Sequence, residues 1–295
     1  MTTRTIHAAL RVSLCAAAVL LFASAPASAE DSYAEVLFLR GDVTAQRRGA
    51  PLEAKVGTRL VSGDTIVAGA DSGASLRLFG GLEATDHDHV QVKANTTLAI
   101  ESLAETAGAP KKGVLGLIKG ALSWITGGSG EAKRDVQVHA PTTIGGVRGT
   151  EFRMIVEAPG STRIEVLEGT VNTTGASSEL DVGPGKGSRV RPGGEPETLH
   201  PLPAAPTVKA GDGGALDRFS FQWSKVQGAA SYVVEIALEE SFTRIVYEQG
   251  EEATRHEPVS AKLPEHTGAF YWRVSAVDAD GYQGFYSAAG SFTLP

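Results

Sequence analysis

The chain has 295 residues and a formal net charge of −7, with 35 glycines, 42% apolar residues and only 6% aromatic residues. This length and composition suit a medium β domain followed by a smaller one, each with its own core. An acidic chain without a basic stripe disfavours nucleic acid and other polyanions as partners.

Residues 1–29 are predicted to be a cleaved secretory signal peptide. Arg4 and Arg11 form the positive start, an apolar stretch follows, and small residues at 27–29 provide the cleavage site. The only cysteine, Cys15, lies inside this leader, so we expect no disulfide or cysteine metal site in the mature chain. We therefore expect an exported protein, periplasmic or at the cell surface, with no transmembrane segment after cleavage.

Alternating apolar and polar residues predict strands at 35–46, 60–68, 75–79 and 90–100. The loop LEATDHDHV between the last two holds the one metal-like cluster of the sequence. If this loop is extended, His87 and His89 share a face and could contribute to a zinc site. No third ligand is evident nearby, so we expect a solvated loop, no metal and no cofactor, with His87 and His89 as the weak metal candidates.

The segment 111–128, KKGVLGLIKGALSWITGG, leaves two interpretations open. Val114, Leu117 and Trp124 have helical spacing, and the lysines would make a basic amphipathic helix for a membrane surface or a partner. Three glycines would each cost such a helix about 1 kcal/mol relative to alanine. Two strands broken at Gly120 also fit the pattern, and we favour them.

The clearest turn signals lie between Val136 and Val171. The pieces VQVHAP, EFRMIVE and TRIEVLEGTV alternate as strands, and they are bounded by proline and glycine. The intervening TTIGGVRGT has glycines that would allow positive φ or close backbone approach at a bulge or tight corner. We expect an inward-packed corner, with Ile144 and Val147 in the core and Arg148 locking the flanking strands rather than binding a ligand.

These residues carry a resemblance to a known family. Three stretches resemble the FecR-type domain, and the resemblance covers residues 36–190. They are TTIGGVRGTEFRMIVE, TRIEVLEGTV and the earlier VLFLRGDVTAQRRGAPLEAKVGTRLVSGDTIVAGADSGASLRL. The resemblance implies an all-β periplasmic domain, a sandwich or a rolled sheet, that in regulatory members relays a surface signal to a sigma factor. It also implies a structural role for the motif residues Gly146, Val147, Arg148, Gly149, Thr150, Glu151 and Phe152.

The last eighty residues gain aromatic side chains. FSFQWSKV, SYVVEIALEE and FYWRVSAVDADGYQGFYS each place apolar residues on one strand face, which favours a small β-sandwich. The pattern resembles a fibronectin type III or related immunoglobulin-like domain, with Trp223 and Trp272 in its core. Tyr282, Phe285 and Tyr286 lie near a loop and are the weak candidates for an exposed binding surface.

The predicted fold class is therefore all-β. Its predicted organisation is a signal peptide at 1–29, a FecR-like domain at 30–191, a Pro/Gly-rich linker at 192–214 and a fibronectin type III-like sandwich at 215–295.

No catalytic triad, metal triad or phosphate-binding loop stands out, so we expect no enzyme and no catalytic residues. Our first hypothesis is a non-catalytic exported binding or scaffold protein of the bacterial cell envelope, with an envelope protein or cell-wall polymer as its partner. The alternative is a periplasmic signal-sensing regulator, related to the FecR sigma-factor regulators, that acts through a separate membrane partner. Neither hypothesis fixes an oligomeric state.

Overall fold

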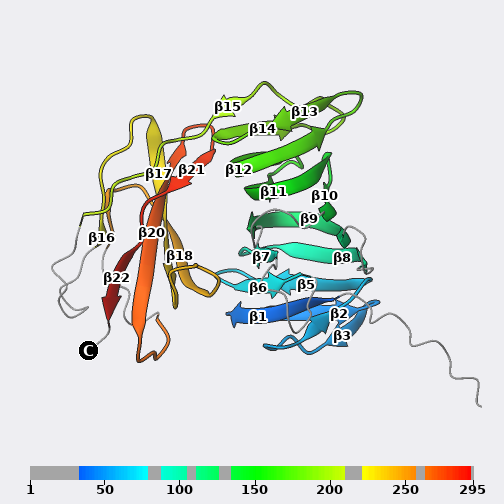
Figure 1. Cartoon of the computed structure of the whole chain (residues 1–295), viewed down its shortest axis with the longest axis horizontal. Coiled ribbons are helices and arrows are strands. Elements are labelled where there is room, and N and C mark those ends of the chain that lie inside the picture. Colours follow the sequence, from blue (N-terminus) through cyan, green and yellow to red (C-terminus); the bar gives the residue numbers. More distant parts are fainter. Residues whose placement is uncertain are drawn as a thin grey trace, which may run out of the picture. The chain divides into compact units, whose positions relative to one another are not determined.

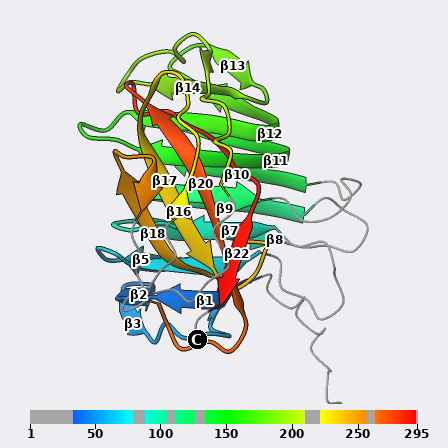
Figure 2. The ribbon, with the colours of Figure 1, turned by 90° about the vertical axis from the view of Figure 1, so that its left-hand side faces the viewer.

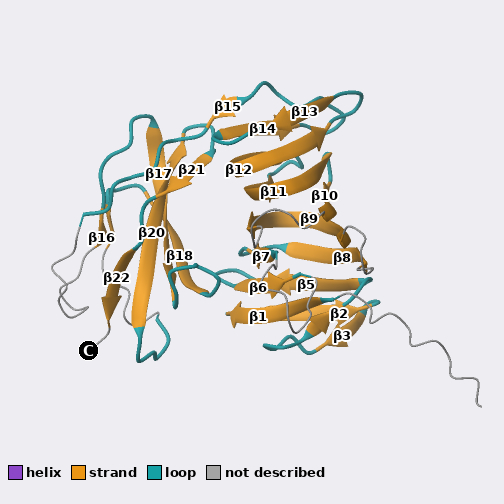
Figure 3. Ribbon diagram, in the orientation of Figure 1, coloured by secondary structure: helices purple, strands orange, loops and turns teal. Residues whose placement is uncertain are grey.

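The structure is a computed structural model that describes residues 33–78, 88–104, 111–125, 134–209, 221–256 and 263–293. Over these ranges the chain consists of strands, turns and loops, without a helix (Figure 3). The predicted all-β class is confirmed. The predicted signal peptide lies outside the described residues. No helix in the described part of the chain has the length and hydropathy needed to cross a membrane.

The strands up to residue 201 form one branched sheet, which divides into two half-sheets (Figure 1). The first half-sheet has the strand order β15 (His200–Pro201), β14 (Lys186–Val190), β12 (Thr162–Thr174), β11 (Thr143–Val156), β9 (Lys111–Ile125), β7 (His89–Val92), β6 (Gly73–Arg77), β1 (Ala34–Arg40) and β4 (Arg59–Leu60). The second has the order β13 (Glu179–Val182), β12, β11, β10 (Arg134–Ala140), β9, β8 (Thr97–Ala104), β5 (Asp64–Ala68), β2 (Val43–Arg47) and β3 (Ala50–Leu52).

Three long strands, β9, β11 and β12, belong to both half-sheets because each changes partners midway. The first part of β9 pairs with β8 and β10, whereas residues 120–125 pair with β7 and β11. The change falls at Gly120, whose φ of +85° suits glycine, and β12 has Gly169 at φ +75° between its two parts. The segment 111–125 is therefore one bent strand, neither a helix nor two separate strands.

The predicted corner in β11 is a register shift between Arg148 and Glu151. Gly145 is needed for close packing rather than for a positive φ, because a Cβ there would lie 2.7 Å from Cε of Met154. Val147 is buried, but Ile144 is 39% exposed, so its predicted inward packing is wrong. The alternation of the strand before the bend places Ile144 on the outer face.

One apolar core joins the two half-sheets. Leu76, Trp124 and Phe152 of the first half-sheet belong to the same buried cluster as Leu115 and Val138 of the second. The rings of Trp124 and Phe152 stack with centroids 6.0 Å apart. The alternating residues of both half-sheets thus fill the space between them, as in a sandwich.

We call the two half-sheets the first body. The C-terminal strands form the second body. The main sheet has the strand order β18 (Ile245–Glu251), β17 (Ala229–Ala237), β20 (Ala269–Asp278) and β21 (Gln283–Tyr286). β22 (Gly290–Thr293) also pairs with β20. A separate pair joins β16 (Phe221–Gln222) to β19 (Arg255–His256). Their core contains the residues that alternation predicted, including Trp223 and Trp272, both 1% exposed. These two core predictions are confirmed.

The described part of the predicted linker, residues 192–209, makes specific contacts. His200 and Pro201 of β15 pair with β14, and Leu202 is buried against Leu167 and Tyr282. Nothing in these contacts decides where the domain boundaries lie, and the boundaries at 191 and 214 stay predictions.

We expect the bend at Gly120 to be sensitive to any side chain larger than glycine. A Cβ there would lie 2.5 Å from Cα of Thr96, whereas Gly49 has a similar φ of +82° with nothing within 4 Å. Gly49→Ala should cost about 1–2 kcal/mol for its backbone conformation alone. Gly120→Ala should cost a further ~1–3 kcal/mol for the steric conflict. Urea unfolding of both variants measures the difference, and equal losses would contradict this account of the bend.

Candidate interaction site

A row of polar side chains crosses the outer face of the first half-sheet. Ser75 pairs with Gln91, Gln91 with Ser123, Ser123 with Arg153, and Arg153 with Glu165 across five successive strands. All five residues are at most 7% exposed. We call them the polar row. Their neighbours along each strand point into the core, so simple alternation would have left this row in water.

The C-terminal strands cover the polar row (Figure 2). Ser75 Oγ donates to the carbonyl of Thr243 at 2.5 Å, and the amide of Gln91 donates to the carbonyl of Phe242. These two carbonyls belong to the connection between β17 and β18. Backbone carbonyls of the C-terminal body therefore accept the hydrogen bonds of Ser75 and Gln91 at one end of the polar row.

At the other end, Arg153 and Glu165 hold the backbone of β21. Their side chains form an ion pair, with Nε and Oε2 2.7 Å apart. Arg153 Nη2 donates to the carbonyl of Gly284 at 2.8 Å and to that of Gln283, while Glu165 Oε1 accepts from the N–H of Gln283 at 2.9 Å. Burial disfavours the charge of Arg153, but Glu165 outweighs burial and the pKa of Arg153 is raised. Arg153 is thus charged in the buried contact.

A second charged cluster lies on the sheet of the C-terminal body that faces the polar row. Glu235, which is fully buried, accepts from Lys93 at 2.7 Å and from Arg273 at 2.7 Å, and Lys93 also pairs with Glu248. Arg273 lies over the ring of Tyr286, 3.5 Å from its centroid. Burial opposes the ionisation of Glu235, yet Arg273 and Lys93 overcome it and lower its pKa. Lys93 belongs to the first body, so this cluster ties the two bodies together.

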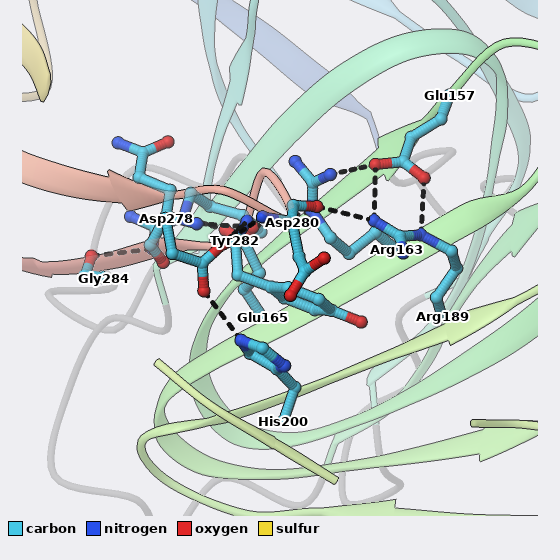
Figure 4. A network of polar contacts seen from close by, with 11 residues as sticks. Glu157, Arg163, Glu165, Arg189, His200, Asp278, Asp280, Tyr282 and Gly284 are labelled. Atoms are coloured by element: carbon cyan, nitrogen blue, oxygen red, sulfur yellow. Dashed lines mark hydrogen bonds and ion pairs between the residues drawn. The ribbon is translucent and has the colours of Figure 1, made fainter. Parts of the chain in front are cut away.

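Further charges surround the turn before β21 (Figure 4). Glu157 accepts from both Arg163 and Arg189, the latter at 2.7 Å, and Arg163 also reaches Glu165 at 2.9 Å. Arg189 Nη2 donates to the carbonyl of Asp280 at 2.8 Å. This network extends the ion pair of Glu165 to β14 and to the turn between β20 and β21.

His200 closes the same region from β15. Its Nε2 lies 2.7 Å from Oδ2 of Asp278, and its ring stacks on Tyr282 with centroids 4.2 Å apart (Figure 4). Oδ1 of Asp278 accepts from the N–H groups of Asp280 and Tyr282. Burial raises the pKa of Tyr282 to about 12.

His200, Asp278 and Asp280 are close enough together to be considered as metal ligands, with candidate atoms within 4.8 Å of one another. The hydrogen bond between His200 and Asp278 already satisfies two of these groups. Arg189 binds the backbone of Asp280, and a guanidinium so close disfavours an added cation. We assign this cluster to the contact between the bodies rather than to a metal.

The predicted metal candidates lie elsewhere. His87 is outside the described residues, and His89 is half-buried on β7 beside the buried Asp88. Among the described residues, His89 belongs to no group of potential metal ligands.

The predicted binding aromatics do form a contact, but within the chain. Tyr282 is 2% exposed, packed on Leu167 and Leu202, so its predicted exposure is wrong. Phe285 and Tyr286 are half-buried beside it. The turn carries these aromatics inward because β21 docks on the first half-sheet. Whether they contact an outside partner stays a prediction.

The motif residues 146–152 lie on β11 at its bend. Val147, Thr150 and Phe152 are buried, and burial raises the pKa of Glu151. The backbone of Arg148 pairs with that of Thr170, while its side chain lies outside what the structure describes. The structural role predicted for Arg148 stays a prediction.

Comparison with known proteins agrees with the resemblance in the sequence. Residues 64–172 match the family model described as FecR protein. The match runs from the start of β5 into β12 and confirms that part of the predicted range 36–190. The fibronectin type III resemblance stays a prediction.

The search of curated proteins finds no match. Among solved structures, two crystal structures of a candidate anti-sigma factor from Parabacteroides distasonis ATCC 8503 are similar, at 15% and 14% identity and a TM-score of 0.36 each. Each alignment covers 46% of this chain and 59% of the other.

We expect Glu235→Gln to test the buried charge cluster through its pH dependence. Removing this partner takes away the ion pair of Arg273 and leaves Lys93 with Glu248 alone, which should cost about 3–5 kcal/mol at pH 7. The pKa of Glu235 is lowered in the folded state from its ordinary value of 4.5. Its contribution to the free energy of unfolding is therefore complete above pH 4.5 and is lost as the pH falls below that value. The stability gap between the wild type and the variant should therefore shrink in acid.

Urea unfolding at pH 7 and below pH 4 measures this gap. Glu240→Gln changes an exposed glutamate of the same body and is the matched control, expected to leave stability unchanged. A gap for Glu235→Gln that stays constant with pH would contradict the assignment.

Proposed function

We propose that the protein is a non-catalytic FecR-type regulator of the cell envelope. In this proposal it is exported, senses a signal outside the cytosol and passes it on through a separate membrane partner. The observation that carries the proposal is the family match over residues 64–172. It favours the regulator over the scaffold function that we expected first, which has no comparable support.

The contact between the two bodies supports a regulatory role because it is built from buried charges. A relay requires two arrangements that differ little in free energy, so that a partner or ligand can shift the balance. Buried ion pairs lose much of their mutual attraction to the cost of desolvation. The pairs of Arg153 with Glu165 and of Lys93 with Glu235 can therefore give a specific contact that a competing partner could open.

The outer face of the second half-sheet offers a surface for that partner. Ile118 on β9 is 56% exposed and Ile144 on β11 is 39% exposed, and both lie inside the matched stretch. Val56, which is 64% exposed, lies outside it. These three apolar positions allow a comparison between the matched region and a surface of similar exposure.

A photo-crosslinking amino acid at Ile118 or Ile144 should capture a membrane protein in living cells, and one at Val56 should not. Deleting the gene should also change the transcription of a defined set of genes when the envelope is stressed. Ile118→Ser and Ile144→Ser together should reproduce that change without lowering the amount of protein. Retention of the chain on purified cell-wall polymer, with transcription unaffected by deletion, would overturn the regulator and support the scaffold.

A further inference from the structure

A cavity of about 230 Å3 lies where the C-terminal strands cover the polar row. Ser123, Arg153 and Lys93 line it from the first body, and Val233, Glu235 and Glu248 line it from the second. It is smaller than the roughly 300–1,000 Å3 of pockets for drug-sized ligands. Its size therefore suits a small molecule.

Two donors of the polar row beside this cavity make no hydrogen bond of good geometry, although the ring of Tyr286 lies beside Arg153, with its centroid 5.2 Å from Cζ. They are Oγ of Ser123 and Nη1 of Arg153, on side chains 7% and 3% exposed. The two residues are direct neighbours across β9 and β11. A buried donor without a partner costs free energy, so an acceptor placed between them would recover that loss. A carboxylate can accept from both at once.

On the facing side one carboxylate retains accepting capacity. The oxygens of Glu235 already serve Lys93, Arg273 and Tyr286. Glu248 pairs with Lys93, and its side chain is 23% exposed. Of the two acids in the cavity wall, Glu248 is therefore the better placed to accept from a ligand ammonium.

The charges of the wall balance, since Lys93 and Arg153 face Glu235 and Glu248. A ligand with a single net charge would upset this balance, whereas a zwitterion adds both signs. Apart from Gln283, the remaining wall is aliphatic, with Ile155 and Val233 among its residues. Small aliphatic groups fit such a surface.

We propose that this cavity binds a small zwitterionic α-amino acid with an aliphatic side chain. Its carboxylate accepts from Ser123 and Arg153, its ammonium donates to Glu248, and its side chain packs on Ile155 and Val233. Because both bodies contribute contacts, the ligand stabilises their docked arrangement. The inference rests on the cavity and does not depend on the regulatory function proposed above.

Calorimetric titration of the full chain tests the proposal with three probes. Valine should bind at one site per chain and raise the melting temperature. Isobutyrate lacks the ammonium and isobutylamine lacks the carboxylate, so each should bind at least about tenfold more weakly, the change expected for a lost hydrogen bond between charged groups. No saturable heat with valine would mean that the cavity holds water only, and isobutyrate binding as tightly as valine would refute the zwitterion; either result overturns the proposal.

Three variants locate the site. Ser123→Ala removes a donor without breaking a hydrogen bond of the fold and should raise the Kd for valine about tenfold. Ala94→Leu fills the cavity and should abolish binding. Thr173→Val removes a buried hydroxyl without a partner that lies away from the cavity, and should leave the Kd unchanged. Valine binding that survives Ala94→Leu in a folded variant would place the ligand elsewhere and overturn the proposal.

Discussion

The contact between the two bodies depends on the buried ion pair of Arg153 and Glu165. Burying either charge alone would be strongly unfavourable, and the pair is stable because β21 supplies two carbonyls and an N–H to the same groups. Removing β21 would expose both charges or leave them without these hydrogen bonds. Directional hydrogen bonds therefore set the position of the C-terminal strands, together with the apolar contact of Tyr282 with Leu167 and Leu202.

This kind of contact differs from the two cores on either side of it. Trp124 and Phe152 of the first half-sheet share one apolar core with Leu115 and Val138 of the second, and apolar burial is insensitive to pH and has little directional preference. Glu235 and Lys93 join the bodies by charges whose balance a proton, a ligand or a competing partner can change. Two bodies joined by an adjustable polar contact form a suitable element for a signal relay.

The stretch that matches the FecR model contains most of the three bent strands. β9, β11 and the larger part of β12 lie in residues 64–172 and run from one half-sheet to the other. One end of each strand lies under the C-terminal body and the other reaches the second half-sheet, where Ile118 and Ile144 are exposed. These continuous strands connect the proposed ligand cavity with the proposed partner surface.

The sequence by itself determined the all-β class and the aromatic core of the C-terminal strands, because alternation and turn residues act over a few neighbouring positions. Trp223 and Trp272 were found in this way, and Gly120 was recognised as a break. Arg153 and Glu165 alternate with the apolar residues of their strands and lie on the outer face. Alternation could not tell that another part of the chain, more than a hundred residues away, covers them. Only the tertiary structure decided that this face is buried, since side-chain periodicity fixes which way a residue points but not what packs against it.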